Sequence, residues 1–200
     1  MNIDLKEIID IIKLHPFKIK NVYLFGSRVY GNHNENSDYD FLVVANNINT
    51  EQEYKGKLNI HIHIPDIFKR NLFEHDIHEL ECIFAPDFAK MQEKLVYPEF
   101  KIKPQMLYYK LMQQSFNCFK KAKLLWFDGR INECMKNIWH SYRILMFGNQ
   151  IKQYGKIIDF SESNSIYHEM TNCSLNTWDE IKQKYLPGKV KLEENLEQRI

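Results

Sequence analysis

The stretch that decides the fold reads Val22-Tyr23-Leu24-Phe25-Gly26-Ser27-Arg28 and, after a short polar loop, Ser37-Asp38-Tyr39-Asp40-Phe41-Leu42-Val43-Val44. The apolar runs at 22–25 and 41–44 have the length and composition of buried strands. The first ends at Gly-Ser, where a helix is expected to begin, and the second is entered through two aspartates. Side chains two positions apart on an extended segment point to the same face, so we expect both carboxylates on one face.

This arrangement joins a phosphate-binding turn to a pair of acids. Gly26 lets a phosphate approach the backbone closely, and Ser27 adds a hydroxyl donor at a helix N-terminus, whose N–H groups and dipole favour anions. Asp38 and Asp40 supply the hard oxygen ligands that Mg²⁺ prefers, with phosphate and water completing the shell. Gly-Ser and Asp-x-Asp are each common in turns and loops, but together, between two strands, they predict nucleotidyl or phosphoryl transfer.

The pattern Gly26-Ser27-Arg28-x-x-Gly31-x(5)-Ser37-Asp38-x-Asp40 resembles the signature of the DNA polymerase β-type nucleotidyltransferase superfamily. The resemblance implies a mixed sheet with flanking helices. It also implies that Gly26 and Ser27 grip the triphosphate of an NTP while Asp38 and Asp40 bind two divalent ions, Mg²⁺ or Mn²⁺. Arg28 matches a position common in minimal members, where it would contact phosphate or brace the loop, and Ser37 joins these phosphate-binding candidates.

A second motif lies in the C-terminal half of the chain. Lys136-x-x-x-His140-x-x-Arg143, followed by Gly155-Lys156, resembles the helical half of a bacterial and phage subgroup found near RNA-ligase repair genes, and Glu79–Phe84 resembles another of its segments. The spacing i, i+4, i+7 puts the three side chains on one helix face, where they suit a triphosphate or an RNA backbone. The alternative is a solvated face, or a histidine packed against neighbouring aromatic rings.

The third strand departs from the family pattern. The run 58–64 alternates strictly, so its isoleucines face the core and Asn59, His61 and His63 face the site. The family usually places a third carboxylate here, but this strand contains no acid. His61 ranks first and His63 second as its replacement, with Asn59 also possible. A histidine could act as general base or ligate a softer metal such as Mn²⁺, the site could be degenerate, or the histidines could simply be exposed.

Periodicity and punctuation set the organisation of the chain. We expect an α+β protein, with a small mixed-sheet nucleotidyltransferase domain and flanking helices at 1–100 and a helical domain with a charged tail at 101–200. Helices are expected at 3–14 (ended by Pro16), 66–72, 76–84, 105–127, 130–147 and 177–185. The segment 46–56 is expected to be a loop, 87–104 is mixed, Pro187-Gly188 should stop the last helix, and the tail 189–200 should fray.

Composition limits the remaining possibilities. The 27 basic and 26 acidic residues give a net charge of +1, which excludes a strongly basic chain held on nucleic acid by bulk charge but allows a local basic groove. The lysines at 120, 121 and 123 are expected on a solvated face, whereas Tyr109 and Phe116 are expected to pack between helices. The four cysteines, none of them in a CxxC pair, are expected as reduced thiols.

Targeting signals are not evident in the sequence. The charged N-terminus lacks the apolar core of a signal peptide, and no apolar run approaches the ~20 residues that span a bilayer, so we expect a cytoplasmic protein without a membrane partner. The abundance of Lys, Ile and Asn fits a low-GC bacterium or its phage.

The sequence therefore predicts a metal-dependent nucleotidyltransferase. It would transfer a nucleoside monophosphate from an NTP, expected to be ATP, to an acceptor hydroxyl and release pyrophosphate. By resemblance, the acceptor is an RNA or tRNA 3′ end. Two alternatives stay open: AMPylation of a partner protein or small molecule, and a catalytically degenerate nucleotide sensor or scaffold.

Overall fold

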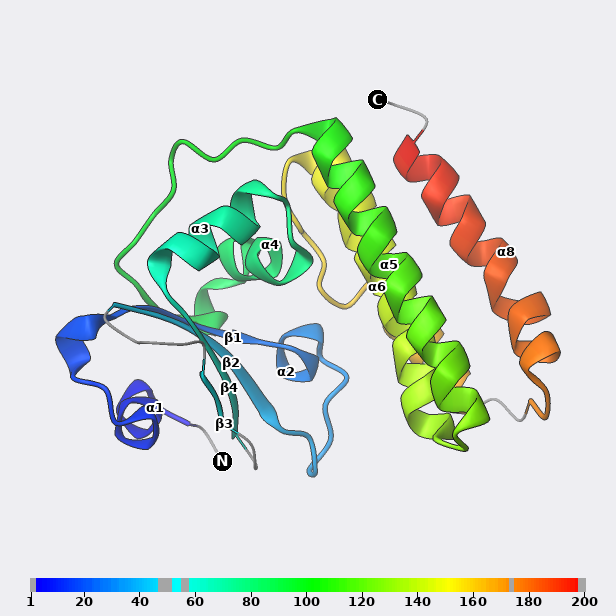
Figure 1. Ribbon diagram of the computed structural model, residues 1–200, viewed down its shortest axis with the longest axis horizontal. Helices are drawn as coiled ribbons and strands as arrows, with labels where there is room; N and C mark the ends of the chain where they lie inside the picture. Colours follow the sequence, from blue (N-terminus) through cyan, green and yellow to red (C-terminus); the bar gives the residue numbers. More distant parts are fainter. Residues whose placement is uncertain (1–2, 47–51, 55–57, 173–174, 198–200) are drawn as a thin grey trace. The chain divides into compact units, whose positions relative to one another are not determined.

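The computed structural model describes residues 3–46, 52–54, 58–172 and 175–197 (Figure 1). The chain divides into two compact units, residues 1–101 and residues 102–200. Unit 1 combines a mixed sheet with short helices, and the elements of unit 2 are helices. The α+β class expected from the sequence is confirmed.

Unit 1 is built on a five-stranded sheet of order β3-β4-β2-β1-β5. β2 pairs parallel with β4, and the other neighbours are antiparallel. The strands are β1 (Ile19–Phe25), β2 (Tyr39–Ala45), β3 (Gln52–Tyr54), β4 (Leu58–His63) and β5 (Lys90–Glu93). The two apolar runs of the deciding motif thus form β1 and β2, two of the three inner strands.

One face of the sheet is covered by α1 (Leu5–Ile12), which presents Ile8 and Ile12 to a core that includes Phe41 and Ile60. Asp4 caps this helix: its carboxylate accepts from the Glu7 N–H at 2.8 Å, and Glu7 accepts from the Asp4 N–H at 3.0 Å. The helix is shorter than the expected 3–14, because Lys13 adopts a left-handed conformation before Pro16 is reached. Pro16 instead opens a 3₁₀ turn, Pro16–Lys18.

The opposite face of the sheet carries the other helices of unit 1, α2 (Ser27–Tyr30), α3 (Pro65–Phe73) and α4 (Ile77–Phe84). Phe68 of α3 stacks on Tyr23 of β1 with ring centroids 5.9 Å apart. A 3₁₀ turn, Asp87–Ala89, then leads into β5, whose pairing closes the free edge of β1.

Two strands lie where loop or irregular structure was expected. Residues 52–54 of the expected loop 46–56 form β3, while 47–51 and 55–57 lie outside the described residues. Residues 90–93 of the mixed region form β5. Both are edge strands of three or four residues without apolar alternation, so their order comes from pairing with β4 and β1 rather than from a local pattern.

Unit 2 is organised around a long antiparallel helix pair, α5 (Pro104–Phe127) and α6 (Ile131–Tyr154), joined through Asp128-Gly129 as expected. Ser115 of α5 donates to the backbone oxygen of Ser141 in α6 at 2.9 Å, a buried contact that fixes their register. Shorter α7 (Asn164–Thr171) and long α8 (Trp178–Glu197) pack on α6. Figure 1 shows α5, α6 and α8 running side by side in this unit.

The last helix contradicts the expectation that it stops at Pro187-Gly188. α8 continues through both residues to Glu197, and Leu196, in the tail expected to fray, is buried. A Cβ at Gly188 would lie 2.8 Å from the Tyr142 hydroxyl, so this glycine permits the close approach of α6. The Tyr142 hydroxyl donates to the backbone oxygen of Tyr185. Packing on α6 therefore outweighs the helix-breaking tendency of Pro-Gly.

None of the helices in the described part of the chain has the length and apolarity needed to cross a membrane. Cys82, Cys118 and Cys134 are free thiols, as expected, and Cys173 lies outside the described residues. Burial raises the pKa of the Cys134 thiol to about 11, which keeps it protonated and unreactive at neutral pH.

Candidate active site

The centre of the candidate site is a close approach between Gly26 and Asp40. Gly26 sits between β1 and α2 with φ 76° and ψ −157°, a conformation essentially restricted to glycine. A Cβ at this position would overlap Oδ2 of Asp40 and lie 3.1 Å from its Cγ. Gly26 is thus required both by the backbone turn and by the carboxylate that lies against it. Ser27 follows as the first residue of α2 and is half-buried.

The loop between α2 and β2 is held by Arg28. Its Nη2 donates to the backbone oxygen of Ser37 at 2.8 Å and its Nε donates to that of Asp38 at 3.2 Å. The guanidinium also lies over the Tyr39 ring, 3.4 Å from its centroid. Of the two roles considered for Arg28, the structure shows a brace of the loop, made through backbone carbonyls and a ring rather than through a salt bridge. Asp38 itself is exposed at the entrance to β2.

Ser37 takes part in the turn of the same loop. Its hydroxyl accepts from the Asn34 N–H at 2.9 Å, which closes the turn ahead of the two aspartates. The contacts of Ser37 are thus structural, and its expected role in phosphate binding stays a prediction.

Register decides which residue of β4 lies beside Asp40 of β2. Asp40 pairs with Asn59, Leu42 with His61 and Val44 with His63. The Asn59 side chain donates to Asp40 Oδ1 at 2.9 Å. Asn59 therefore stands next to Asp40, whereas His61 and His63 lie two and four residues further along β4. All three occupy the face opposite Ile60 and Ile62, as the alternation predicts.

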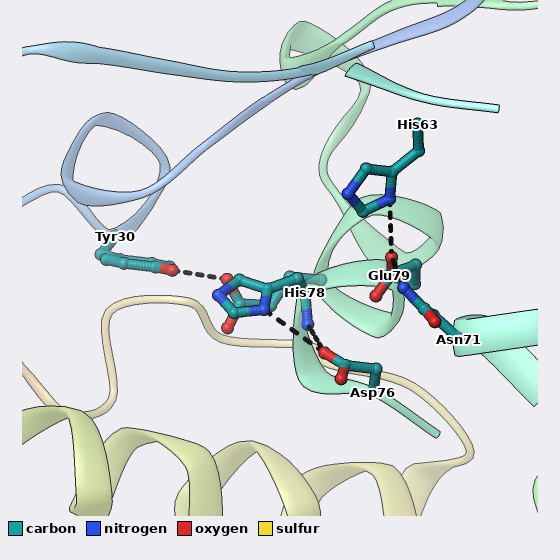
Figure 2. A network of polar contacts seen from close by, with 7 residues as sticks. Tyr30, His63, Asn71, Asp76, His78 and Glu79 are labelled. Carbon is teal, nitrogen blue, oxygen red and sulfur yellow. Dashed lines mark hydrogen bonds and ion pairs between the residues drawn. The ribbon is translucent and has the colours of Figure 1, made fainter. Parts of the chain in front are cut away.

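His63 points toward Glu79 of α4, within a network of polar side chains (Figure 2). Its Nδ1 lies 3.1 Å from Oε1 of Glu79, a residue of α4 that is only 1% exposed. The same Glu79 oxygen accepts from Asn71 of α3 at 3.0 Å. His63 thus ties the end of β4 to both covering helices. The sequence offers one signal for this network: the two acids Glu79 and Glu81 interrupt an otherwise apolar helix.

Glu81, the second buried acid of α4, connects to α2, the short helix that follows Gly26. The Tyr30 hydroxyl at the end of α2 donates to Glu81 Oε2 at 2.5 Å, and both residues are buried. α4 therefore contacts α2 through one acid and β4 through the other. The two structural elements that frame the aspartates are fixed to the same helix.

A small cavity of about 160 Å³ opens beside this network, lined in part by Phe25, His61, His63 and His78. Desolvation acts to lower the pKa of His78, but the hydrogen bond to Asp76 and the nearby negative charges outweigh it, so the pKa is raised above 6.5. His78 therefore carries more positive charge near neutral pH than a free histidine.

Comparisons with known proteins identify the unit that carries this site. Residues 6–97 match the model of the family described as "Polymerase beta, Nucleotidyltransferase". These residues form a polymerase β-type nucleotidyltransferase domain. The match spans β1, α2, β2 and β4, so the site lies entirely within the domain.

Among solved structures, the chain is similar to a nucleotidyltransferase-like protein from Exiguobacterium sibiricum 255-15. The two are 12% identical with a TM-score of 0.34, and the match covers 97% of this chain and 73% of the other. No curated protein matches the chain.

The second motif lies in unit 2, beyond the nucleotidyltransferase domain. Lys136, His140 and Arg143 all lie on α6, where Lys136 is exposed and Arg143 is 3% exposed. The Arg143 guanidinium lies between two rings, 5.8 Å from the centroid of Trp139 and 5.4 Å from that of Phe147. The packed histidine considered above is also seen, since the His140 ring lies 4.7 Å from Trp139. A role of these cations in phosphate binding stays a prediction.

The donor set of the nucleotidyltransferase site fits a hard divalent cation that shares its shell with a substrate. In the described ranges, no three His, Cys, Asp or Glu side chains are grouped so that they could hold a metal ion by themselves. Asp38 and Asp40 supply carboxylate oxygens, and Mg²⁺ is commonly held by one or two carboxylates together with substrate phosphates. The neutral Asn59 amide beside Asp40 adds no negative charge to this set.

Proposed function

We propose that the protein transfers a nucleoside monophosphate from an NTP, with ATP the first substrate to test, to the 3′ hydroxyl of an RNA, and releases pyrophosphate. The observation that supports this most directly is the fit of the Asp40 carboxylate against Gly26, at the start of the helix that would hold the phosphates. A carboxylate and a phosphate are both negatively charged and repel each other. A divalent cation between them removes this repulsion, so a carboxylate next to a phosphate-binding turn favours a metal-bound phosphate.

Each residue then has a defined part. The backbone at Gly26 and the Ser27 hydroxyl bind the β- and γ-phosphates, while Asp38 and Asp40 hold the divalent ion. A bound Mg²⁺ or Mn²⁺ supplies charge stabilisation for the transferring phosphoryl group and lowers the pKa of the attacking hydroxyl. Arg28 keeps the loop in place through the carbonyls of Ser37 and Asp38, so the aspartates are positioned before substrate binds.

Asn59 lies beside Asp40 on the strand where the family usually has a third carboxylate. This difference affects which group can remove the proton of the attacking hydroxyl. An amide cannot accept a proton at neutral pH, so Asn59 positions Asp40 and does not act as a base. We therefore propose His61, two residues further along the same strand, as the general base.

The test is pyrophosphate release with each NTP, with Mg²⁺ or Mn²⁺ and total tRNA, following label into RNA and into protein. Asp38→Asn and Asp40→Asn are each expected to reduce turnover at least about 100-fold, the scale of a charge-stabilising group. Asp10→Asn, which makes the same charge change on the exposed side of α1, serves as the matched control and should retain activity. Unchanged turnover in the Asp38 and Asp40 variants would contradict the assignment.

A second candidate function is favoured by the neutral side chain at Asn59. A site with two carboxylates and no base fits a sensor that binds NTP without turnover. Asp38-dependent NTP binding with no pyrophosphate release under any metal would select it, and Asn59→Asp would then be expected to introduce transfer. Label found on protein instead of RNA would select AMPylation of a partner.

A further inference from the structure

α5 exposes a row of aromatic and basic side chains on one side of unit 2. Tyr109, Phe116 and Phe127 are 64%, 60% and 69% exposed, and Lys120 and Lys123 are also exposed. We call these five residues the α5 face. The expectation that Tyr109 and Phe116 pack between helices is wrong, because most of each side chain is exposed.

The five side chains form one narrow line along the helix. Their successive spacings of 7, 4, 3 and 4 residues follow from their numbers, and at 100° per residue they lie within an arc of roughly 60°. With a rise of 1.5 Å per residue, the line extends over about 27 Å. Rings stand at both ends and near the middle, with the two lysines between Phe116 and Phe127.

The rest of α5 is firmly packed, so the α5 face belongs to an ordered helix. Leu107, Leu111 and Ala122 on the opposite side are buried against unit 2. On the flank, Phe119 contacts Trp178 of α8 with ring centroids 5.7 Å apart. α5 thus packs against α6 and α8 (Figure 1), while the five residues of the α5 face are exposed.

Charge is segregated on this helix. Residues 104–127 contain four lysines and no aspartate or glutamate, although the whole chain holds 26 acids against 27 bases. A second copy of the chain paired through its own α5 face would therefore bring lysine against lysine. A polyanion with flat apolar rings meets both features, because its phosphates pair with lysine and its bases stack on aromatic side chains.

We propose that the α5 face binds single-stranded RNA. Tyr109, Phe116 and Phe127 stack on bases, and Lys120 and Lys123 contact phosphates. Stacking on rings tolerates any base, so binding is expected to depend on strandedness and salt more than on sequence. That this RNA is the acceptor strand rests on the proposed function; the binding itself does not.

The test measures fluorescence anisotropy of a short labelled oligouridylate and its duplex with the full chain. Lys120→Gln with Lys123→Gln should weaken binding about tenfold or more and lower the salt slope by about 2, one per phosphate contact. Phe116→Ser should weaken it at least about fivefold. Lys182→Gln with Lys191→Gln makes the same charge change at exposed positions of α8 and should leave binding unchanged.

The outcomes separate this proposal from the proposed function. Wild-type protein that does not bind the oligonucleotide, or face variants that bind like wild type, would overturn it, even if transfer to RNA is observed. Binding of an acidic polypeptide but not of RNA would overturn it in favour of a protein partner. If Asp38→Asn binds RNA normally and the face variants do not, the α5 face is supported whether or not nucleotide transfer occurs.

Discussion

Replacing Gly26 by alanine should destabilise unit 1 far more than the same change at an unobstructed glycine. The backbone conformation at Gly26 costs a non-glycine residue about 1–3 kcal/mol. The added Cβ would overlap Asp40 Oδ2, so the carboxylate must move and give up the hydrogen bond from Asn59. A hydrogen bond to a charged group contributes about 1.5–3 kcal/mol, which brings the expected total to about 2.5–6 kcal/mol.

Gly155→Ala supplies the matched comparison. Gly155 has a similar φ of 74°, but no atom lies within 4 Å of where its Cβ would stand. The substitution there should cost about 1–2 kcal/mol from backbone strain alone. Urea unfolding followed by far-UV circular dichroism gives both free energies of unfolding.

A double-mutant cycle isolates the crowding at Asp40. With Asp40→Ala in place, Gly26→Ala should cost only the strain, so the two changes should be coupled by about 1.5–3 kcal/mol. Gly26→Ala should also lower nucleotide transfer, since it displaces a carboxylate of the site. A penalty no larger than that at Gly155, or strict additivity with Asp40→Ala, would refute the claim that Gly26 is glycine because of Asp40.

Three further outcomes are expected. Glu79→Leu should destabilise the protein by about 1–3 kcal/mol in urea unfolding, because the half-buried His63 imidazole and Asn71 amide lose the buried carboxylate they contact; an unchanged free energy of unfolding would contradict this. Gly188→Ala should cost about 1–3 kcal/mol through overlap with the Tyr142 hydroxyl, and Tyr142→Phe should remove part of that penalty. The pKa of His78 is raised, so the contribution of His78 to folding stability should be full below about pH 6.5 and lost as pH rises through the folded pKa. In an NMR titration, Asp76→Asn should show a lower His78 pKa than wild type. An unchanged His78 pKa would contradict the role assigned to Asp76.

The sequence predicted those parts of the fold that depend on local pattern. The apolar runs at 22–25 and 41–44 and the alternation at 58–64 formed the expected strands, and the helical period at 105–127 formed α5. The helix expected at 130–147 was also found, but α6 extends to Tyr154. The turn at Gly26 was recognisable because its backbone conformation requires glycine, and the acids at 38 and 40 were recognisable by their spacing next to an apolar strand.

The features that could not be predicted from the sequence depend on contacts between distant segments. Alternation shows that Asn59, His61 and His63 share a face, but only strand register places Asn59 beside Asp40. Register depends on pairing between strands, so the sequence of one strand does not determine it. The continuation of α8 past Pro187 likewise comes from its contact with α6, and the short edge strands β3 and β5 depend on their neighbours.

β5 is synthesised long after β1, the strand whose edge it covers. β1 pairs with β2 within its own neighbourhood, but its other edge is covered only by residues 90–93, and the buried side chain of Asn21 bonds to the backbone of Lys94 and Leu95. At a synthesis rate of about 5–20 residues per second, these partners are made about 4–14 s after β1. During that interval a nascent chain presents an open strand edge, where Lys20 is the kind of charged residue that discourages pairing with another chain. The translation speed between residues 25 and 95 therefore sets how long the open edge of β1 in the nascent chain is exposed to aggregation.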